Sequence, residues 1–296
     1  MVRTTIEDET SLLAALRVFF PESSSTTVRK MLESGRVRVN GEVEKKPNRA
    51  LLAGDVIDVG ARPTRRDLDP RLDLLYEDED LLVVVKAAGL LTVATPGERE
   101  QTAQAFLNDY LRSRGSKERI HVAHRLDRAS SGVLVFAKNF ETRELLKDRF
   151  AAHDIERVYI AIIEGTMETR EGTIRSYLEE DRSLKVRSVP GGGGGKPAVT
   201  HYRTIEEGAR WSMLEVRLET GRKNQIRVHL SEAGHPIAGD QTYGAATDPI
   251  GRLALHAMVL GFQHPHDGRR MVFTSPLPQS FRGVVKRTAS IPTPGA

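Results

Sequence analysis

The chain of 296 residues contains no cysteine. This absence excludes disulfides, thiolate metal sites and a cysteine nucleophile. No apolar run is long enough to span a bilayer. The first twenty residues are acidic and their apolar positions are interrupted by charge, a pattern typical of neither a signal peptide nor a transit peptide. We therefore expect a cytoplasmic protein without a membrane segment.

Charged residues, by contrast, are plentiful. The 44 lysines and arginines outnumber the 40 aspartates and glutamates, which gives a formal net charge of +4 and a pI of about 9.3. This balance is compatible with a polyanionic partner without requiring one. At this length, with 39% hydrophobic residues, the chain can bury the core of one large domain and one small domain.

Two segments interrupt the apolar patterning. Residues 60–73, GARPTRRDLDPRLD, are rich in proline, glycine and charge, and indicate an interdomain linker. Residues 190–197, PGGGGGKP, predict a mobile loop tip. This loop is no phosphate-binding P-loop, because prolines occupy the positions of the first glycine and of the Ser/Thr. We predict a small domain at 1–60, a linker at 61–73, a large domain at 74–287 and a flexible tail at 288–296.

The sequence of the small domain predicts a helix, a hairpin and a final strand. Val28, Met31 and Leu32 share one helical face, and Gly35 is placed to end that helix. Alternating residues then lead to Asn40-Gly41, the strongest hairpin signal in the chain. A Gly-Asp turn precedes a last strand, VIDV. The predicted module is a small α/β unit whose exposed face carries the basic residues Arg29, Lys30, Arg36, Arg38, Lys45 and Lys46.

The stretches ESGRVRVNGEV and AGDVIDV resemble the small RNA-binding domain of ribosomal protein S4 type, over residues 11–59. The resemblance implies that the basic face binds RNA. The family usually opens its recognition helix with a basic Ser-Arg pair, whereas this helix opens SSSTTVRK. The alternative is a hairpin whose charged face is merely solvated.

In the large domain, strand signals outnumber helix signals. Residues 80–86, 133–138, 157–165 and 212–220 predict strands, and residues 141–151 and 222–234 predict helices. A regular β-α-β rhythm is missing. We therefore predict an α+β domain with a mixed, largely antiparallel sheet and flanking helices.

One carboxylate of this domain lies in a basic setting. Asp127 follows His124 and Arg125 and precedes Arg128, and the loop leads through two serines and a glycine into the strand at 133–138. An isolated aspartate flanked by arginines is most often a surface ion pair.

Four groups of segments, in order, change that interpretation. They are HRLDRASSGV, RVYIAIIEG, LETGRKNQIRVHL with HPIAGDQTYG, and RLALHAMVLGFQHP with FTSPLP. Together, over residues 72–282, they resemble the RluA-type pseudouridine synthases. The resemblance implies an isomerase that converts uridine to pseudouridine in structured RNA, either large-subunit ribosomal RNA or tRNA. It implies neither a metal nor a redox cofactor.

The resemblance also implies roles for three side chains. Asp127 is the expected nucleophile, or the group that stabilises the detached intermediate, and Arg227 pairs with it and keeps it ionised. Tyr159 lies against the target base and is a candidate proton acceptor. The chain departs from the family pattern at Val133, where leucine is usual, and at Lys223-Asn224, where Thr-His is usual.

The target base must leave its stack to reach Asp127. Arg125, beside the nucleophile, could fill the vacated space or grip the backbone. Arg222, at a predicted helix N-terminus, suits phosphate binding, although a structural ion pair is an equal alternative.

Other functions are disfavoured. The histidines and aspartate at His256, His264, His266 and Asp267 could suggest a metal site, but GFQHPHDG is more typical of a turn between strands. A serine hydrolase is disfavoured because no Gly-x-Ser-x-Gly elbow surrounds the serines. A non-catalytic RNA-binding or ribosome-assembly protein remains the alternative. We expect a monomer whose partner is RNA. The pattern does not identify which RNA or uridine is modified.

Overall fold

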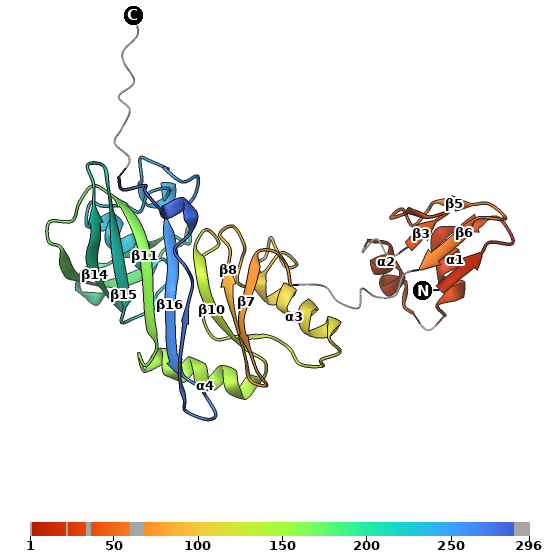
Figure 1. Cartoon of the computed structure of the whole chain (residues 1–296), viewed down its shortest axis with the longest axis horizontal. Helices are drawn as coiled ribbons and strands as arrows, with labels where there is room; N and C mark the ends of the chain where they lie inside the picture. Colours follow the sequence, from red (N-terminus) through yellow and green to blue (C-terminus); the bar gives the residue numbers. More distant parts are fainter. Residues whose placement is uncertain (1, 22, 34–36, 60–67, 287–296) are drawn as a thin grey trace, which may run out of the picture. The chain divides into compact units, whose positions relative to one another are not determined.

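The structure is a computed structural model that describes residues 2–21, 23–33, 37–59 and 68–286 (Figure 1). The chain divides into two compact units, Met1–Asp67 with Arg112–Ser116, and Leu68–Leu111 with Lys117–Ala296. The predicted helix terminator Gly35, the basic residue Arg36, most of the predicted linker and the predicted tail lie outside the described residues. No helix in the described ranges is long and apolar enough to cross a membrane.

The first unit packs two helices against a four-stranded sheet of order β1-β6-β3-β4. The predicted helical face is confirmed, since Val28 and Leu32 are buried. The predicted hairpin is also confirmed: Asn40 and Gly41 both have positive φ at the turn between two paired strands. The elements are β1 Val2–Thr5, β2 Thr10–Ser11, α1 Leu12–Phe19, α2 Ser25–Glu33, β3 Val37–Val39, β4 Glu42–Val43, β5 Ala50–Leu51 and β6 Val56–Val59.

The second unit is built on one large sheet of order β13-β12-β14-β15-β11-β16-β10-β8-β7, with β17 beside β16 and β9 beside β10. Every pair is antiparallel except β10 with β16, so the predicted mixed, largely antiparallel sheet is confirmed. The strands are β7 Leu72–Glu77, β8 Leu81–Lys86, β9 His121–Val122, β10 Ser131–Ala137, β11 Glu156–Glu164, β12 Glu171–Glu180, β13 Val186–Ser188, β14 Lys196–Glu207, β15 Trp211–Leu218, β16 Leu255–Gln263 and β17 Arg270–Thr274.

Three α-helices accompany this sheet: α3 Ala103–Ser113, α4 Phe140–Ala151 and α5 Gln225–Glu232. Three short 3-10 turns complete the unit, η1 Pro190–Gly192, η2 Gln241–Tyr243 and η3 Gln279–Phe281. The glycine-rich segment joins β13 to β14, and β7 begins at Leu72, inside the segment predicted as linker. The turn predicted at GFQHPHDG is confirmed, because it connects β16 to β17.

Strand β10 explains why its sequence is an unbroken apolar run. Its residues are buried on both faces of the sheet. Phe136 packs in a cluster that includes Leu107 of α3, whereas Val135 packs in a cluster that includes Leu146 of α4. A strand covered on both sides needs no polar face. This firmly packed strand carries the Asp127 loop at its N-terminal end.

Candidate active site

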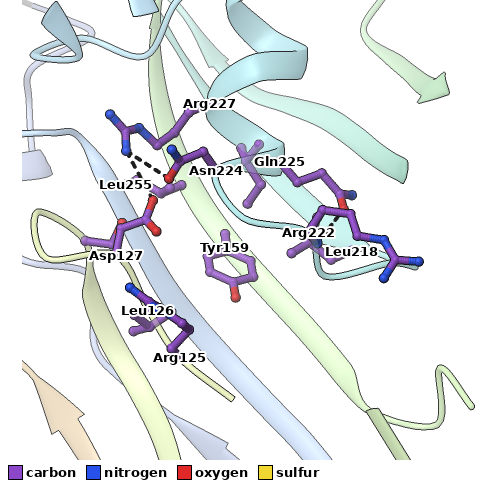
Figure 2. Close-up of a pocket in the computed structure, with 12 residues that line it drawn as sticks. Arg125, Leu126, Asp127, Tyr159, Leu218, Arg222, Asn224, Gln225, Arg227 and Leu255 are labelled. Atoms are coloured by element: carbon purple, nitrogen blue, oxygen red, sulfur yellow. Dashed lines mark hydrogen bonds and ion pairs between the residues drawn. The ribbon is translucent and has the colours of Figure 1, made fainter. Parts of the chain in front are cut away.

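The site residues predicted for the large domain line one cavity of the large unit (Figure 2). The loop before β10 supplies Arg125 and Asp127, β11 supplies Tyr159, and the segment around the start of α5 supplies Arg222 and Arg227. These residues lie far apart in sequence, and the central strands of the sheet bring them together.

Asp127 and Arg227 are within ion-pair distance. The Nη1 atom of Arg227 lies 3.3 Å from Oδ2 of Asp127. The shorter contacts of Arg227, however, are with Asp240: Nε and Nη2 each donate to a different carboxylate oxygen at 2.7 Å. The Asp240 side chain is only 1% exposed, whereas that of Asp127 is 25% exposed. The guanidinium is therefore anchored by Asp240, while Asp127 keeps an accessible carboxylate.

Further contacts hold the Arg227 side chain in place. Its Nη1 donates to Oδ1 of Asn224 at 3.1 Å, and the Asn224 amide donates to the Tyr243 hydroxyl at 3.0 Å. The guanidinium also lies 4.9 Å from the centre of the Tyr243 ring. Burial opposes the charge, but hydrogen bonds and charge from Asp240 outweigh it and raise the pKa of Arg227. Asn224, a departure from the family pattern, thus belongs to this anchor.

Figure 2 shows Tyr159 with Asp127 and Arg125 on one side and Arg222 on the other. In Figure 2 its hydroxyl points into the space between Arg125 and Arg222. Burial raises the pKa of Tyr159, Arg157 opposes the rise and Asp127 adds to it. The side chain is therefore a neutral phenol at neutral pH. The chemistry available to it is to stack on a base and to donate a hydrogen bond.

A buried lysine fixes the loop that carries Asp127. Lys86, at the end of β8, is fully buried, and its Nζ donates to the carbonyls of Leu90 and Ser130 at 2.7 Å and to that of Arg128 at 3.4 Å. Burial lowers the pKa of Lys86 to about 7, although the charge of Asp127 opposes this. From the sequence alone, Lys86 is predicted only as the last residue of a buried strand, where a charge ends an apolar run.

His124 has a structural place in the same loop. Its Nε2 accepts a hydrogen bond from the backbone N–H of Val135 at 3.1 Å, and its ring stacks on Phe150 at 4.5 Å. Burial, with a smaller effect of Arg157, lowers the pKa of His124 to about 3. The ring is therefore neutral, and the proton resides on Nδ1 because Nε2 is an acceptor.

The two candidate RNA-contacting arginines differ in their surroundings. Arg125 is exposed, with no hydrogen bond or ion pair to any described residue. Arg222 donates from Nε to the carbonyl of Pro197 at 3.0 Å. Helix α5 begins only at Gln225, so Arg222 precedes the helix instead of starting it. Across the described residues Arg222 forms no ion pair, and it donates one further hydrogen bond, from its backbone N–H to the Gln225 side chain at 3.0 Å.

The histidines of the last segments serve the fold. His256 hydrogen-bonds to Oγ of Ser131 at 2.9 Å, and His264 contacts Asp78 at 3.0 Å. In the part of the chain that the structure describes, no group of three or more His, Asp or Glu side chains could hold a metal ion.

In the small unit, the side chains of Arg29, Arg38, Lys45 and Lys46 are exposed. The side chain of Lys30 and the whole of Arg36 lie outside the described residues. The described part of the predicted basic face is thus open to solvent.

Comparison with known proteins agrees with this geometry. Residues 80–232 match the RNA pseudouridylate synthase family, and residues 16–57 match the S4 domain. Ribosomal large subunit pseudouridine synthase D of Neisseria meningitidis is 33% identical over 90% of this chain and 75% of that protein. An uncharacterised RNA pseudouridine synthase of Bacillus subtilis is 35% identical over 89% of each chain.

Among solved structures, human RNA pseudouridylate synthase domain containing 4 has a similar fold. The TM-score is 0.61 at 23% identity, covering 72% of this chain and 92% of the other. With the family match spanning more than half of the chain, the conclusion is plain: this protein belongs to the RluA-type RNA pseudouridine synthases with an N-terminal S4 domain, isomerases that convert uridine in RNA to pseudouridine.

Proposed function

We propose that the enzyme isomerises specific uridines of structured RNA, in large-subunit ribosomal RNA or tRNA, with Asp127 as the nucleophile. The observation that carries the proposal is the pairing of an accessible Asp127 with an Arg227 anchored on buried Asp240. An anchored cation can hold the carboxylate in position and leave its other oxygen free to attack. The name of the Neisseria relative favours large-subunit ribosomal RNA as the first substrate to test.

The reaction makes simple demands on the protein. The bond between C1′ of the ribose and N1 of the base breaks, the base turns, and C5 bonds to C1′. The proton on C5 is then lost and N1 gains a proton, so the product is an isomer of the substrate. A carboxylate that attacks the nucleoside and later leaves it supplies the covalent catalysis.

Tyr159 is proposed to stack on the target base while it turns. Its raised pKa means that the phenol keeps its proton at neutral pH. It can take the C5 proton only if its own proton leaves first, so packing and orientation are its primary role. The aromatic ring gives a flat, rigid surface for this purpose.

Arg125 and Arg222 are proposed to hold the flipped-out nucleotide. Arg125 is exposed beside Asp127 with no described partner, which suits a side chain that fills the space left by the base. Arg222 lines the same cavity from the segment that precedes α5. Its two guanidinium amino groups remain available to a phosphate.

Release of tritium from RNA labelled at uridine C5 tests the function. We expect release from unmodified large-subunit ribosomal RNA or from unmodified tRNA, and sequencing of the modified position then identifies the uridine. The alternative is a non-catalytic RNA-binding protein on the same scaffold. Tight binding of both RNAs without any tritium release would favour that alternative.

A further inference from the structure

A buried arginine beside the active site lacks a carboxylate partner. Arg157 lies in β11, two residues before Tyr159, and is only 7% exposed. Its Nη2 donates to the backbone carbonyls of Leu218 at 3.4 Å and Glu219 at 2.9 Å. Nε is buried without a hydrogen-bond partner among the described residues, and no ion pair of Arg157 occurs there. Burial of a cation without an opposite charge is strongly unfavourable.

Arg157 faces a second cavity of about 320 Å³ that adjoins the active site, since Leu218 lines both. The carboxylates of this cavity are already paired. Glu156 contacts Arg217 at 3.3 Å and Arg270 at 2.7 Å, and Asp154 contacts an arginine of α4 at 2.9 Å. The positive charge of Arg157 is therefore left for a ligand.

A glycine makes room for the free end of this side chain. A Cβ atom built on Gly221 would lie 2.4 Å from Nη1 of Arg157, and the next nearest atom is the guanidinium carbon at 3.6 Å. A Cβ atom at position 221 would therefore displace the guanidinium, and apart from its chain neighbours it would have no other atom within 4 Å. Nη1 has no hydrogen-bond partner within the described ranges, so it is the atom that a ligand would contact.

We propose that Arg157 binds a phosphate of the RNA strand next to the target uridine, which makes the second cavity a backbone subsite of the active site. The inference rests on the proposed function, because the anion is supplied by the RNA substrate. A phosphodiester is anionic, and guanidinium groups match its oxygens well. The RNA phosphate supplies the negative charge that Arg157 lacks in the free protein. Binding therefore relieves the cost of burying an unpaired cation, and this relief favours the complex.

The test is a salt titration of the full-length protein with a short fluorescein-labelled single-stranded RNA containing one central uridine. Arg157→Met should weaken binding about tenfold and make the slope of log affinity against log salt shallower by about 0.7. Arg157→Lys keeps the charge and should keep most of the slope. Arg203→Met is the matched control, because Arg203 lies in neither cavity and pairs with Glu215; both affinity and slope should stay unchanged.

Two further measurements distinguish a phosphate-binding Arg157 from an Arg157 that only holds the end of β15 in place through its hydrogen bonds to Leu218 and Glu219. Arg157→Met should not lower the midpoint of urea unfolding, because it removes a buried cation whose partners in the free protein are two backbone carbonyls and the Phe150 ring, with no carboxylate among the described residues. Gly221→Ala keeps the charge but displaces Nη1, and should also weaken RNA binding.

An unchanged salt slope in Arg157→Met, or a lowered unfolding midpoint with unchanged affinity, would overturn the inference. Failure of the proposed function is distinguishable, because it appears as wild-type protein that releases no tritium.

Discussion

Arg227 serves two carboxylates of different burial. Its two 2.7 Å contacts are with Asp240, whose side chain is 1% exposed, and its 3.3 Å contact is with Asp127. A buried carboxylate that loses its cation destabilises a protein by about 3–5 kcal/mol. Truncation of Arg227 alone would therefore lower both stability and activity, and the two effects must be separated.

Arg227→Ala is predicted to reduce the single-turnover rate by at least about 100-fold, because Asp127 loses the cation that pairs with it and positions it. It should also lower the unfolding free energy by about 3 kcal/mol. The double variant Arg227→Gln with Asp240→Asn keeps a hydrogen bond without charge. It should recover much of the stability in urea unfolding and none of the rate. Recovery of the rate would show that Asp127 does not need the cation.

Lys86 predicts a pH dependence of stability. Its pKa is about 7 in the fold, against 10.5 for an ordinary lysine. Between these values the unfolded chain binds more protons, so a rise in pH favours the folded state. The unfolding free energy of the wild type should therefore rise relative to that of Lys86→Met, by up to about 1.4 kcal/mol per pH unit. Urea unfolding of both proteins between pH 7.5 and 9.5, roughly within the range between the folded and unfolded pKa of Lys86, measures this difference in unfolding free energy.

The control for this experiment is Lys147→Met, on the exposed surface of α4 beside Glu144. Its unfolding free energy should follow that of the wild type across the same pH range. Parallel curves for the wild type and Lys86→Met would contradict the prediction, because they would mean that Lys86 keeps its proton in the fold.

The sequence predicts part of this site and not the rest. Asp127, Tyr159 and Arg227 lie in recognisable motifs, and the fold brings them to one cavity. Asp240 also lies in one of those motifs, but only the geometry reveals it as the anchor. Lys86 could not be assigned, because its partner carbonyls include that of Ser130, 44 residues away. Contacts of this kind depend on the packing of distant strands.

At the scale of elements, the parallel pairing of β10 with β16 is a close approach of two backbones. Gly132 has a φ of +123°, and a Cβ atom there would lie 2.1 Å from the carbonyl oxygen of Ala257. The backbone cannot give way, because Gly132 pairs with Ala257 and with Lys86 on either side. Only glycine therefore fits at position 132, the second residue of β10.

Gly132→Ala is predicted to lower the unfolding free energy by about 3 kcal/mol or more, from combined backbone strain and overpacking. Gly268→Ala is the matched control, because Gly268 has a φ of +72° with no atom within 4 Å of the added Cβ. That variant should lose only about 1 kcal/mol of unfolding free energy, because backbone strain is its only cost. Equal losses in thermal or urea unfolding would mean that the β10–β16 contact is not close-packed.

The strands that the sequence predicts in the large sheet bury most of their residues. Strands β8, β10, β11 and β15 were predicted because their apolar patterns are strong, and α4 and α5 because their core positions recur at helical spacing. Strand β12 was missed because among its ten residues only Leu178 is buried. Within α4, Leu146 is fully buried whereas its neighbour Leu145 is exposed. Apolar spacing alone does not choose between adjacent leucines.

At the scale of the whole molecule, the large unit is predicted to carry out the reaction and the small unit to add affinity for the RNA. Removal of residues 1–66 should leave the large unit folded and its single-turnover rate on saturating short RNA largely unchanged, because the site residues all remain. Affinity for the full RNA substrate should fall, and the salt slope should become shallower by about 1–3. Salt titrations and single-turnover rates of both proteins test this.

Full-length protein with Arg29→Glu and Arg38→Glu is the control for that truncation, because both side chains are exposed on the small unit. It should reproduce most of the affinity loss with the fold intact. An unchanged affinity and salt slope after truncation would mean that the small unit does not contact that RNA. A lost rate at saturation would mean that it helps to form the active site.

The central claim is that Asp127 is the nucleophile, and a single-turnover assay of Asp127→Asn tests it most directly. The amide has nearly the same shape as the carboxylate but carries no charge, so the variant should fold normally and bind RNA with an affinity within about twofold of wild type, while tritium release falls at least about 1000-fold. Mass spectrometry must show asparagine at position 127, which excludes reversion by deamidation. Tritium release at the wild-type rate by that verified variant would contradict the assignment.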